Sequence, residues 1–345
     1  MKAKFYLHPE SIAFKDNVMS PEEYRQRWST LICDIRMILR DKTEQNVLVS
    51  TEDFFNGMPI FNGQPVYQYI CGPSFTNDES TWLYEVLDQT QTEEFSPQEI
   101  EKASFFNEQE EKALKECKAL IVINEVEQKE TALAERNREY ITFDKYAIVY
   151  DRRSWLYVRR QILGNHPESA ESFFNRCKAY FPNITFSEHC LNSLSERCDG
   201  MGDEYWRFIP HRVVYYLSCI NDRFMDFMKA KYSNGGNQAD KEPDGNLMNA
   251  LEEFSGVYNF DRVASPQGNP KKKENYTFSF ELPTIEGGKE HMSVISINCG
   301  PHLKIEYIDS QYCSKGKMDT NNVHPRIYLT VHNGQIMVGH IGRHL

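Results

Sequence analysis

The spacing of the hydrophobic residues changes once along this chain of 345 residues, and that change limits the folds it can adopt. Upstream of residue 233, apolar residues recur mostly with the helical period of about 3.6, whereas downstream of residue 246 they alternate with the strand period of two. Residues 233–246, between the two patterns, contain one alanine and no other hydrophobic residue. Because this segment has nothing to bury, it predicts an exposed loop without regular structure.

The upstream part mixes helices with short buried strands. Residues 20–23 and 96–99 both read Ser-Pro-x-Glu, which is a capping box with proline at the first helical position. A long helix follows the first box, a charged helix to Lys118 follows the second, and strands are predicted at residues 47–49, 119–123 and 146–150. The sequence therefore predicts an α+β protein with an acidic α/β region (1–150), a helical region (151–246) and a β-rich module (247–345).

The β-rich module ends in a hairpin. Two alternating runs, at residues 326–331 and 335–340, are joined by His332-Asn333-Gly334. Asn-Gly between two such runs is a strong signal of a tight hairpin turn. With the runs at 276–281, 291–297 and 303–308, an antiparallel sheet of about five strands is predicted.

Charge and cysteine usage point to a cytoplasmic protein. The net charge of -11 comes mainly from the first 140 residues, which hold 15 Lys and Arg against 26 Asp and Glu. Such a region disfavours nucleic acid, so we expect a protein partner or an antitoxin there. The nine cysteines are scattered without a Cys-x-x-Cys pair, which indicates reduced thiols, and neither a signal peptide nor a membrane span is predicted.

Basic and histidine side chains gather at the C-terminal end, where six of the ten histidines lie between residues 291 and 344. Residues two apart on a strand share a face, and the hairpin brings Arg326 and Tyr328 beside the strand that ends at His340. A group of this kind without carboxylates suits metal-independent RNA cleavage: one group takes the 2′-OH proton, one stabilises the phosphorane and one protonates the leaving oxygen. No metal or other cofactor is expected. The candidate catalytic residues are His302, Lys304, Arg326, His340 and His344, and we expect His302, Lys304, Arg326 and His344 to line one concavity.

The same residues have a structural interpretation, because basic and histidine side chains on a sheet are commonly solvated or packed against backbone carbonyls. The order His-x-Lys, Arg-Ile-Tyr, turn, strand, Gly-x-His-x-Leu nevertheless resembles the C-terminal half of RelE-superfamily mRNA interferases. It is also similar to the ends of uncharacterised bacterial phage-defence proteins. The resemblance covers residues 299–345 and implies RNA cleavage without metal. It matches His344 to the late catalytic histidine of the family, and His302, Lys304 and Arg326 to its positive platform.

Three further patterns carry weaker hypotheses. Arg160 and His166 fit the loose Arg-x(4–6)-His signature of HEPN ribonucleases. His189-Cys190 with Cys198 lacks a fourth ligand at a usable spacing, so a zinc site is not predicted. A basic helix beside Trp155 suggests a surface for RNA, although an ion-paired helix face is the common alternative. The candidate nucleic-acid-binding residues are Arg152, Arg153, Arg159, Arg160 and Arg343.

These observations predict a cytosolic ribonuclease-type toxin acting in bacterial antiviral defence. The alternative is a non-catalytic subunit that binds nucleic acid or protein in a multiprotein defence or restriction system.

Overall fold

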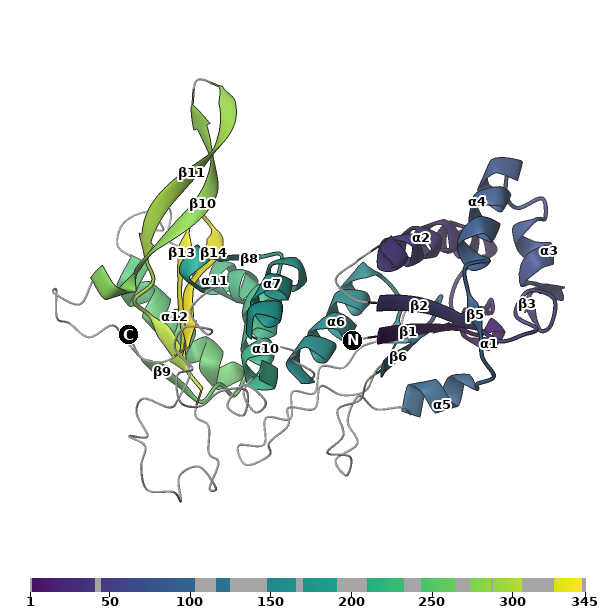
Figure 1. The fold of residues 1–345 in the computed structure, drawn as a ribbon, viewed down its shortest axis with the longest axis horizontal. Helices are drawn as coiled ribbons and strands as arrows, with labels where there is room; N and C mark the ends of the chain where they lie inside the picture. The colour runs from purple at the N-terminus through teal and green to yellow at the C-terminus, as the bar shows by residue number, and fades with distance from the viewer. Residues whose placement is uncertain are drawn as a thin grey trace, which may run out of the picture. The chain divides into compact units, whose positions relative to one another are not determined.

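The computed structural model describes residues 2–40, 45–102, 116–124, 148–165, 170–190, 210–232, 243–264, 274–286, 288–305 and 326–342. The contacts divide these residues into two compact units, one that extends to Ile162 and one that starts at Leu163. The fold is of the α+β class (Figure 1). From Leu163 onward, the helical region and the β-rich module distinguished in the sequence share the second unit, because a strand from the former joins the sheet of the latter.

The first unit is built on a parallel five-stranded sheet. The spatial order is β5-β2-β1-β6-β7, so the first strand of the chain lies in the middle. β6 begins at Glu116, which corrects the predicted helix to Lys118. The strands are β1 (Lys2–Leu7), β2 (Gln45–Ser50), β5 (Gln91–Thr92), β6 (Glu116–Ile121) and β7 (Ile148–Val149).

One face of this sheet is covered mainly by α2 (Pro21–Arg40), which is the long helix predicted from the sequence. Its buried stripe, which includes Tyr24, Trp28 and Ile35, packs against Phe5 and Leu48 of the sheet. Ile100 contacts the opposite face. The remaining elements of the unit are α1 (Pro9–Ile12), β3 (Pro59–Phe61), β4 (Gln64–Pro65), α3 (Val66–Ile70), α4 (Asn77–Leu87), α5 (Pro97–Lys102) and most of α6 (Arg152–Asn165).

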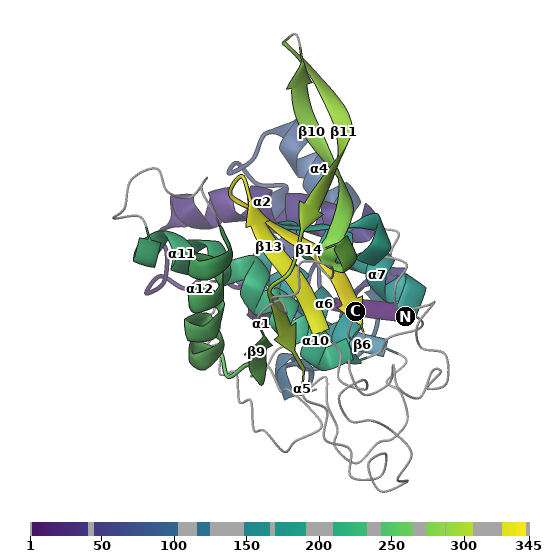
Figure 2. The ribbon, with the colours of Figure 1, turned by 90° about the vertical axis from the view of Figure 1, so that its left-hand side faces the viewer.

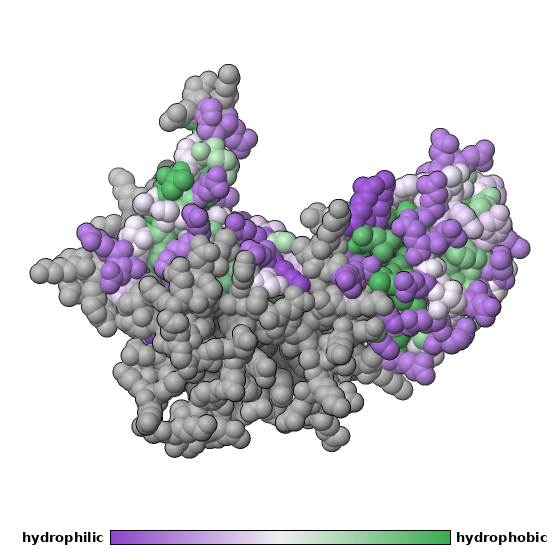
Figure 3. All heavy atoms as spheres, in the orientation of Figure 1, coloured by the Kyte–Doolittle hydropathy of each residue, from purple (hydrophilic) through white to green (hydrophobic). Residues whose placement is uncertain are grey.

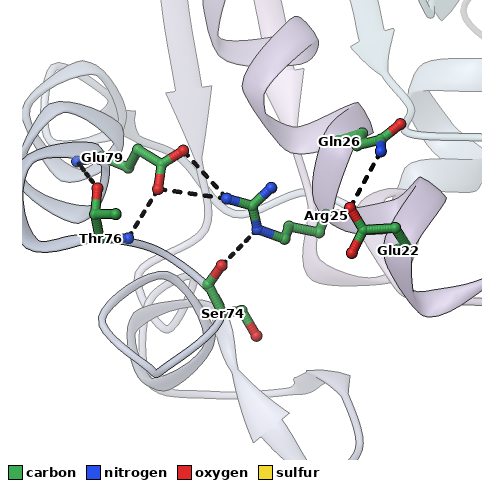
Figure 4. A network of polar contacts seen from close by, with 6 residues as sticks. All are labelled: Glu22, Arg25, Gln26, Ser74, Thr76 and Glu79. Carbon is green, nitrogen blue, oxygen red and sulfur yellow. Dashed lines mark hydrogen bonds and ion pairs between the residues drawn. The ribbon is translucent and has the colours of Figure 1, made fainter.

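The predicted helix starts are formed by side-chain caps. The Ser20 hydroxyl accepts from Glu23 N, and the Glu23 carboxylate accepts from Ser20 N at 2.7 Å. Thr76 and Glu79 cap α4 in the same way, and Arg25 of α2 donates to Glu79 and to the Ser74 carbonyl (Figure 4). One cap residue therefore also ties α4 to α2.

The helices of the second unit come first in sequence. α12 begins at Pro243, so residues 243–246 are helical and the predicted loop is wrong there; residues 233–242 lie outside the described part. Among the described helices none is long and apolar enough to cross a membrane. The helices are α7 (Ala170–Tyr180), α10 (Pro210–Cys219), a π-helical turn (Ile220–Phe224), α11 (Met225–Tyr232) and α12 (Pro243–Val257).

The strands of the second unit form a five-stranded sheet in the order β8-β14-β13-β12-β9 and a separate hairpin, β10–β11. The predicted sheet is thus corrected: the runs at 276–281 and 291–297 form the hairpin, and β8 pairs in parallel with β14. Figure 2 shows the hairpin extending beyond the sheet. The strands are β8 (Ile184–Phe186), β9 (Arg262–Ala264), β10 (Thr277–Glu286), β11 (Lys289–Asn298), β12 (His302–Lys304), β13 (Arg326–His332) and β14 (Gln335–Gly342).

Candidate functional site

The turn between β13 and β14 sets the geometry of the C-terminal cluster. Asn333 and Gly334 both have positive φ, at 49° and 74°, which is the conformation of a tight hairpin turn. From this turn the strands pair residue by residue as far as Leu329 with Val338; a register shift between Tyr328 and Leu329 then pairs Tyr328 with His340 and Arg326 with Gly342. The predicted hairpin is confirmed.

The register places four of the predicted residues on one face of the sheet. β12 pairs with β13 so that His302 faces Tyr328 and Lys304 faces Arg326. Paired residues and residues two apart share a face, so His302, Lys304, Arg326 and His340 lie together. His344 and Arg343 lie outside the described residues.

A row of rings crosses this face. The His302 and Tyr328 rings are stacked with centroids 4.5 Å apart, and the Tyr328 and His340 rings are 5.5 Å apart. His189, three residues after β8, extends the row with its ring 5.3 Å from that of His340. We refer to His189, His302, Tyr328 and His340 as the ring row.

The base of the hairpin β10–β11 covers the ring row. Tyr276 stacks on Tyr328 at 5.6 Å, and the Phe278 ring lies 5.2 Å from His189 and parallel to His340. Gly339 makes this approach possible, because a Cβ there would lie 2.1 Å from Cδ2 of Phe278. Only a residue without a side chain fits opposite that ring.

The burial of the C-terminal cluster limits the access of any substrate to its side chains. His302, Arg326 and His340 are 4%, 6% and 0% exposed, whereas Lys304 is half-buried. Of the four residues expected to line one concavity, His302, Lys304 and Arg326 share a face and His344 lies outside the described residues; that face is a packed interior and not an open concavity. A phosphodiester would reach His302 or His340 only after the hairpin had moved.

Hydrogen bonds hold the cluster in place. His302 Nδ1 lies 3.2 Å from the Gly300 carbonyl; since a carbonyl only accepts, Nδ1 carries the proton. The Ser187 hydroxyl donates to the Gly339 carbonyl at 2.6 Å and accepts from Cys190 N at 2.9 Å. The segment after β8 is therefore fixed to β14.

Buried thiols surround the ring row. Burial raises the pKa of the Cys299 thiol to about 12, although a hydrogen bond from the backbone N–H of Gly339 opposes the shift. Burial also raises the pKa of Cys177 and Cys190 well above the ordinary range. Thiols that stay protonated are poor nucleophiles and poor metal ligands. Within the described residues, no group of three or more His, Cys, Asp or Glu side chains could hold a metal ion.

The basic helix does not form the predicted surface. Arg159 and Arg160 of α6 are buried, and the Arg159 guanidinium lies 4.5 Å from the ring centroid of Trp155. These two side chains therefore lie in the interior and not on the surface expected from the sequence. The side chains of Arg152 and Arg153, and all of His166, lie outside the described part of the chain.

The outer face of the hairpin carries exposed apolar residues. Pairing of Pro283 with Met292, of Glu281 with Val294 and of Ile285 with Glu290 puts these side chains on the face opposite Phe278. Ile285, Val294 and Met292 are 80%, 74% and 59% exposed. We call Pro283, Ile285, Met292 and Val294 the outer patch; Figure 3 shows apolar residues between hydrophilic ones along the hairpin.

Sequence reasoning missed His189 and the outer patch for different reasons. His189 belongs to the site only because β8, three residues long, pairs with a strand 150 positions later, and no local pattern shows such a pairing. The outer patch had a signal: Ile285, Met292 and Val294 interrupt the polar half of the alternation around Gly287-Gly288.

Comparison of the chain with protein-family models, with curated proteins and with solved structures found no match.

Proposed function

We propose that this chain is a binding subunit, and that the outer patch of the hairpin β10–β11 docks a partner protein. The observation that carries the proposal is the exposure of three large apolar side chains, Ile285, Met292 and Val294, on a projecting hairpin. Contiguous exposed apolar residues mark interaction sites in soluble proteins. Full burial of one such side chain contributes about 1.5–3 kcal/mol.

The hairpin is anchored well enough to present this patch. Phe278, Phe280, Leu282 and Ile297 on its inner face belong to the same core as Tyr328. A preorganised strand pair loses little conformational entropy when it binds. The ring row then has a structural task, which is to hold the base of the hairpin against the sheet.

The charges beside the patch indicate the chemistry of the partner. Glu281 and Glu290 lie on the same outer face, opposite Val294 and Ile285, and both are exposed. A protein with an apolar surface rimmed by Lys or Arg would complement both features.

Partner capture with matched variants tests the proposal. The full chain and its Val294→Asp and Val257→Asp variants are used as baits for proteins of the source cells, followed by mass spectrometry. Val257, at the end of α12, is a valine of similar exposure, 62%, in the same unit. We expect one protein to be retained stoichiometrically by the wild type and by Val257→Asp but lost with Val294→Asp. Replacement of both Glu281 and Glu290 by Lys should weaken the retention of that protein.

Three outcomes contradict the proposal. They are the absence of a stoichiometric partner, equal retention by Val294→Asp, and sedimentation velocity showing that Val294→Asp abolishes self-association. The last result would assign the patch to a second copy of the chain.

A metal-independent ribonuclease is the second candidate, and it rests on the shared face of His302, Lys304, Arg326 and His340. It requires the hairpin to move, since three of these side chains are buried. Under this candidate His344→Ala abolishes growth arrest on expression while the protein stays folded. A His344→Ala protein that still arrests growth contradicts that role for His344.

A further inference from the structure

The parallel sheet of the first unit has a point at which the strand order reverses. From β1 the chain proceeds outward to β2 and β5 on one side, and later to β6 and β7 on the other. In open parallel sheets, ligands bind outside the carboxyl ends of the two strands at such a reversal. In this chain those ends are Leu7 of β1 and Ile121 of β6.

Hydrogen bonds connect the segments that leave these two strands. The Ser11 hydroxyl donates to the Ile121 carbonyl at 2.8 Å, and Ile123 N donates to the Ser11 carbonyl at 3.2 Å. Arg27 of α2 reaches the same place, because its Nε lies 3.4 Å from the Ile123 carbonyl. The Arg27 guanidinium also lies 4.0 Å from the ring centroid of Tyr150, the residue after β7.

Within the part of the chain that the structure describes, three polar atoms at this edge are buried without a hydrogen-bond partner: Arg27 Nη2, Thr51 Oγ1 and Asn124 Oδ1. Thr51 directly follows β2, one position beyond the pairing of Ser50 with Leu7, and it is 5% exposed. Asn124 directly follows Ile123. A buried polar atom without a partner costs about 1–3 kcal/mol, so each such atom in a native protein calls for a ligand or a water.

A neutral histidine adds a donor to the same edge. His8 directly follows β1, and its Nδ1 accepts from Glu10 N at 3.2 Å. Burial lowers the pKa of His8, while Glu10 and Asp53 act in the opposite direction. In the neutral ring the proton is then on Nε2.

We propose that this edge binds a small molecule with an oxyanion, either a phosphate or a carboxylate. Arg27 holds the oxyanion through Nη2, its guanidinium being positioned by the Ile123 carbonyl and Tyr150. Asn124 Oδ1 accepts from a hydroxyl or amine of the ligand, and the Thr51 hydroxyl completes the site. The turn from Leu7 to Ser11 contains no glycine, which excludes the close pyrophosphate approach that a dinucleotide needs.

Ligand titration by calorimetry on the full chain tests this site. The probes are ribose 5-phosphate and AMP for the phosphate arm, and malate for the carboxylate arm. We expect either the phosphate probes or malate to bind the full chain. Arg27→Gln should weaken that binding about 10-fold to 100-fold. Arg36→Gln, an exposed arginine on the same helix, should leave binding unchanged.

Thr51→Val gives a second readout that does not depend on which probe binds. A methyl group replaces a hydroxyl without a partner, so the ligand-free protein should melt about 2–4 °C higher while ligand affinity falls. If the Thr51 hydroxyl had a purely structural role, its removal in Thr51→Val would lower Tm instead, and that result overturns the proposal. The proposal is also overturned if neither the phosphate probes nor malate bind, or if Arg36→Gln weakens binding as much as Arg27→Gln does. None of these outcomes bears on the outer patch, which lies in the other unit.

Discussion

Replacement of Gly339 by alanine tests whether the hairpin base covers the ring row as described. The new Cβ would lie 2.1 Å from Cδ2, 2.6 Å from Cε2 and 2.8 Å from Cγ of Phe278. Real Cβ atoms do not approach ring carbons so closely, so either the Phe278 ring or β14 must shift. Overpacking of this kind costs about 1–3 kcal/mol. Gly339→Ala should therefore lower Tm by about 2–12 °C.

Equilibrium urea unfolding followed by circular dichroism measures the free energy of unfolding that Gly339→Ala loses. A double-mutant cycle with Phe278 shows whether the loss comes from contact with that ring. Phe278→Ala alone should cost about 3–5 kcal/mol, since it removes a buried ring. In the Phe278→Ala background, Gly339→Ala should cost almost nothing because the clash has gone.

Gly256→Ala in α12 is the control, with nothing within 4 Å of its Cβ position. This substitution should be neutral or stabilise the protein by up to about 1 kcal/mol, since alanine is the better helix former. If Gly339→Ala is harmless, or its cost persists without the Phe278 ring, the packing described for the hairpin base is wrong.

Thr76→Ala should lower the free energy of unfolding by about 0.5–2 kcal/mol, because the Thr76 hydroxyl caps α4, whereas Thr76→Ser should restore it; urea unfolding measures both. Burial raises the pKa of Cys299 from 9.0 to about 12, so the unfolded thiol loses its proton before the folded one does. Stability should thus fall as the pH rises from about 9 towards 12, and a Cys299→Ala protein with the same slope over that range would refute this cause. Any RNA cleavage by the C-terminal cluster should persist in excess EDTA, leave a 2′,3′-cyclic phosphate and slow about 10²–10⁴-fold in Lys304→Ala; a metal-dependent activity would contradict it.

Local rules were sufficient for the elements that carry their own signals. The Ser20 and Glu23 pair starts α2 because both cap bonds form within four residues. The turn at Asn333-Gly334 fixes the register of β13 and β14 as far as Leu329 and Val338, and the strand period fixes which side chains of one strand share a face. The common face of His302, Lys304 and Arg326 follows from these rules, whereas His340 joins it only through the register shift between Tyr328 and Leu329, for which the sequence carries no local signal.

Whether that face is open depends on contacts that no local pattern contains. Phe278 covers His340 only because Gly339 leaves room, and Phe278 and Gly339 are 61 positions apart in the sequence. The short strands β5 and β7 are two residues long, so their places in the parallel sheet were equally hidden. The burial of Arg159 and Arg160 has the same origin, since a basic helix pattern looks identical whether its surroundings are solvent or protein.

The parallel pairing of β8 with β14 has a consequence for the order of events during synthesis. Ile184 pairs with Ile336, so about 150 residues separate the two halves of that contact. At about 5–20 residues per second, a ribosome needs about 8–30 s to produce β14 after β8. Throughout that interval β8 lacks its partner strand, although Phe173 and Phe174 of α7, which are buried in the finished fold, have already been synthesised. We therefore expect the second unit to expose apolar surface for longer during synthesis than the first unit, whose sheet is complete once β7 has emerged.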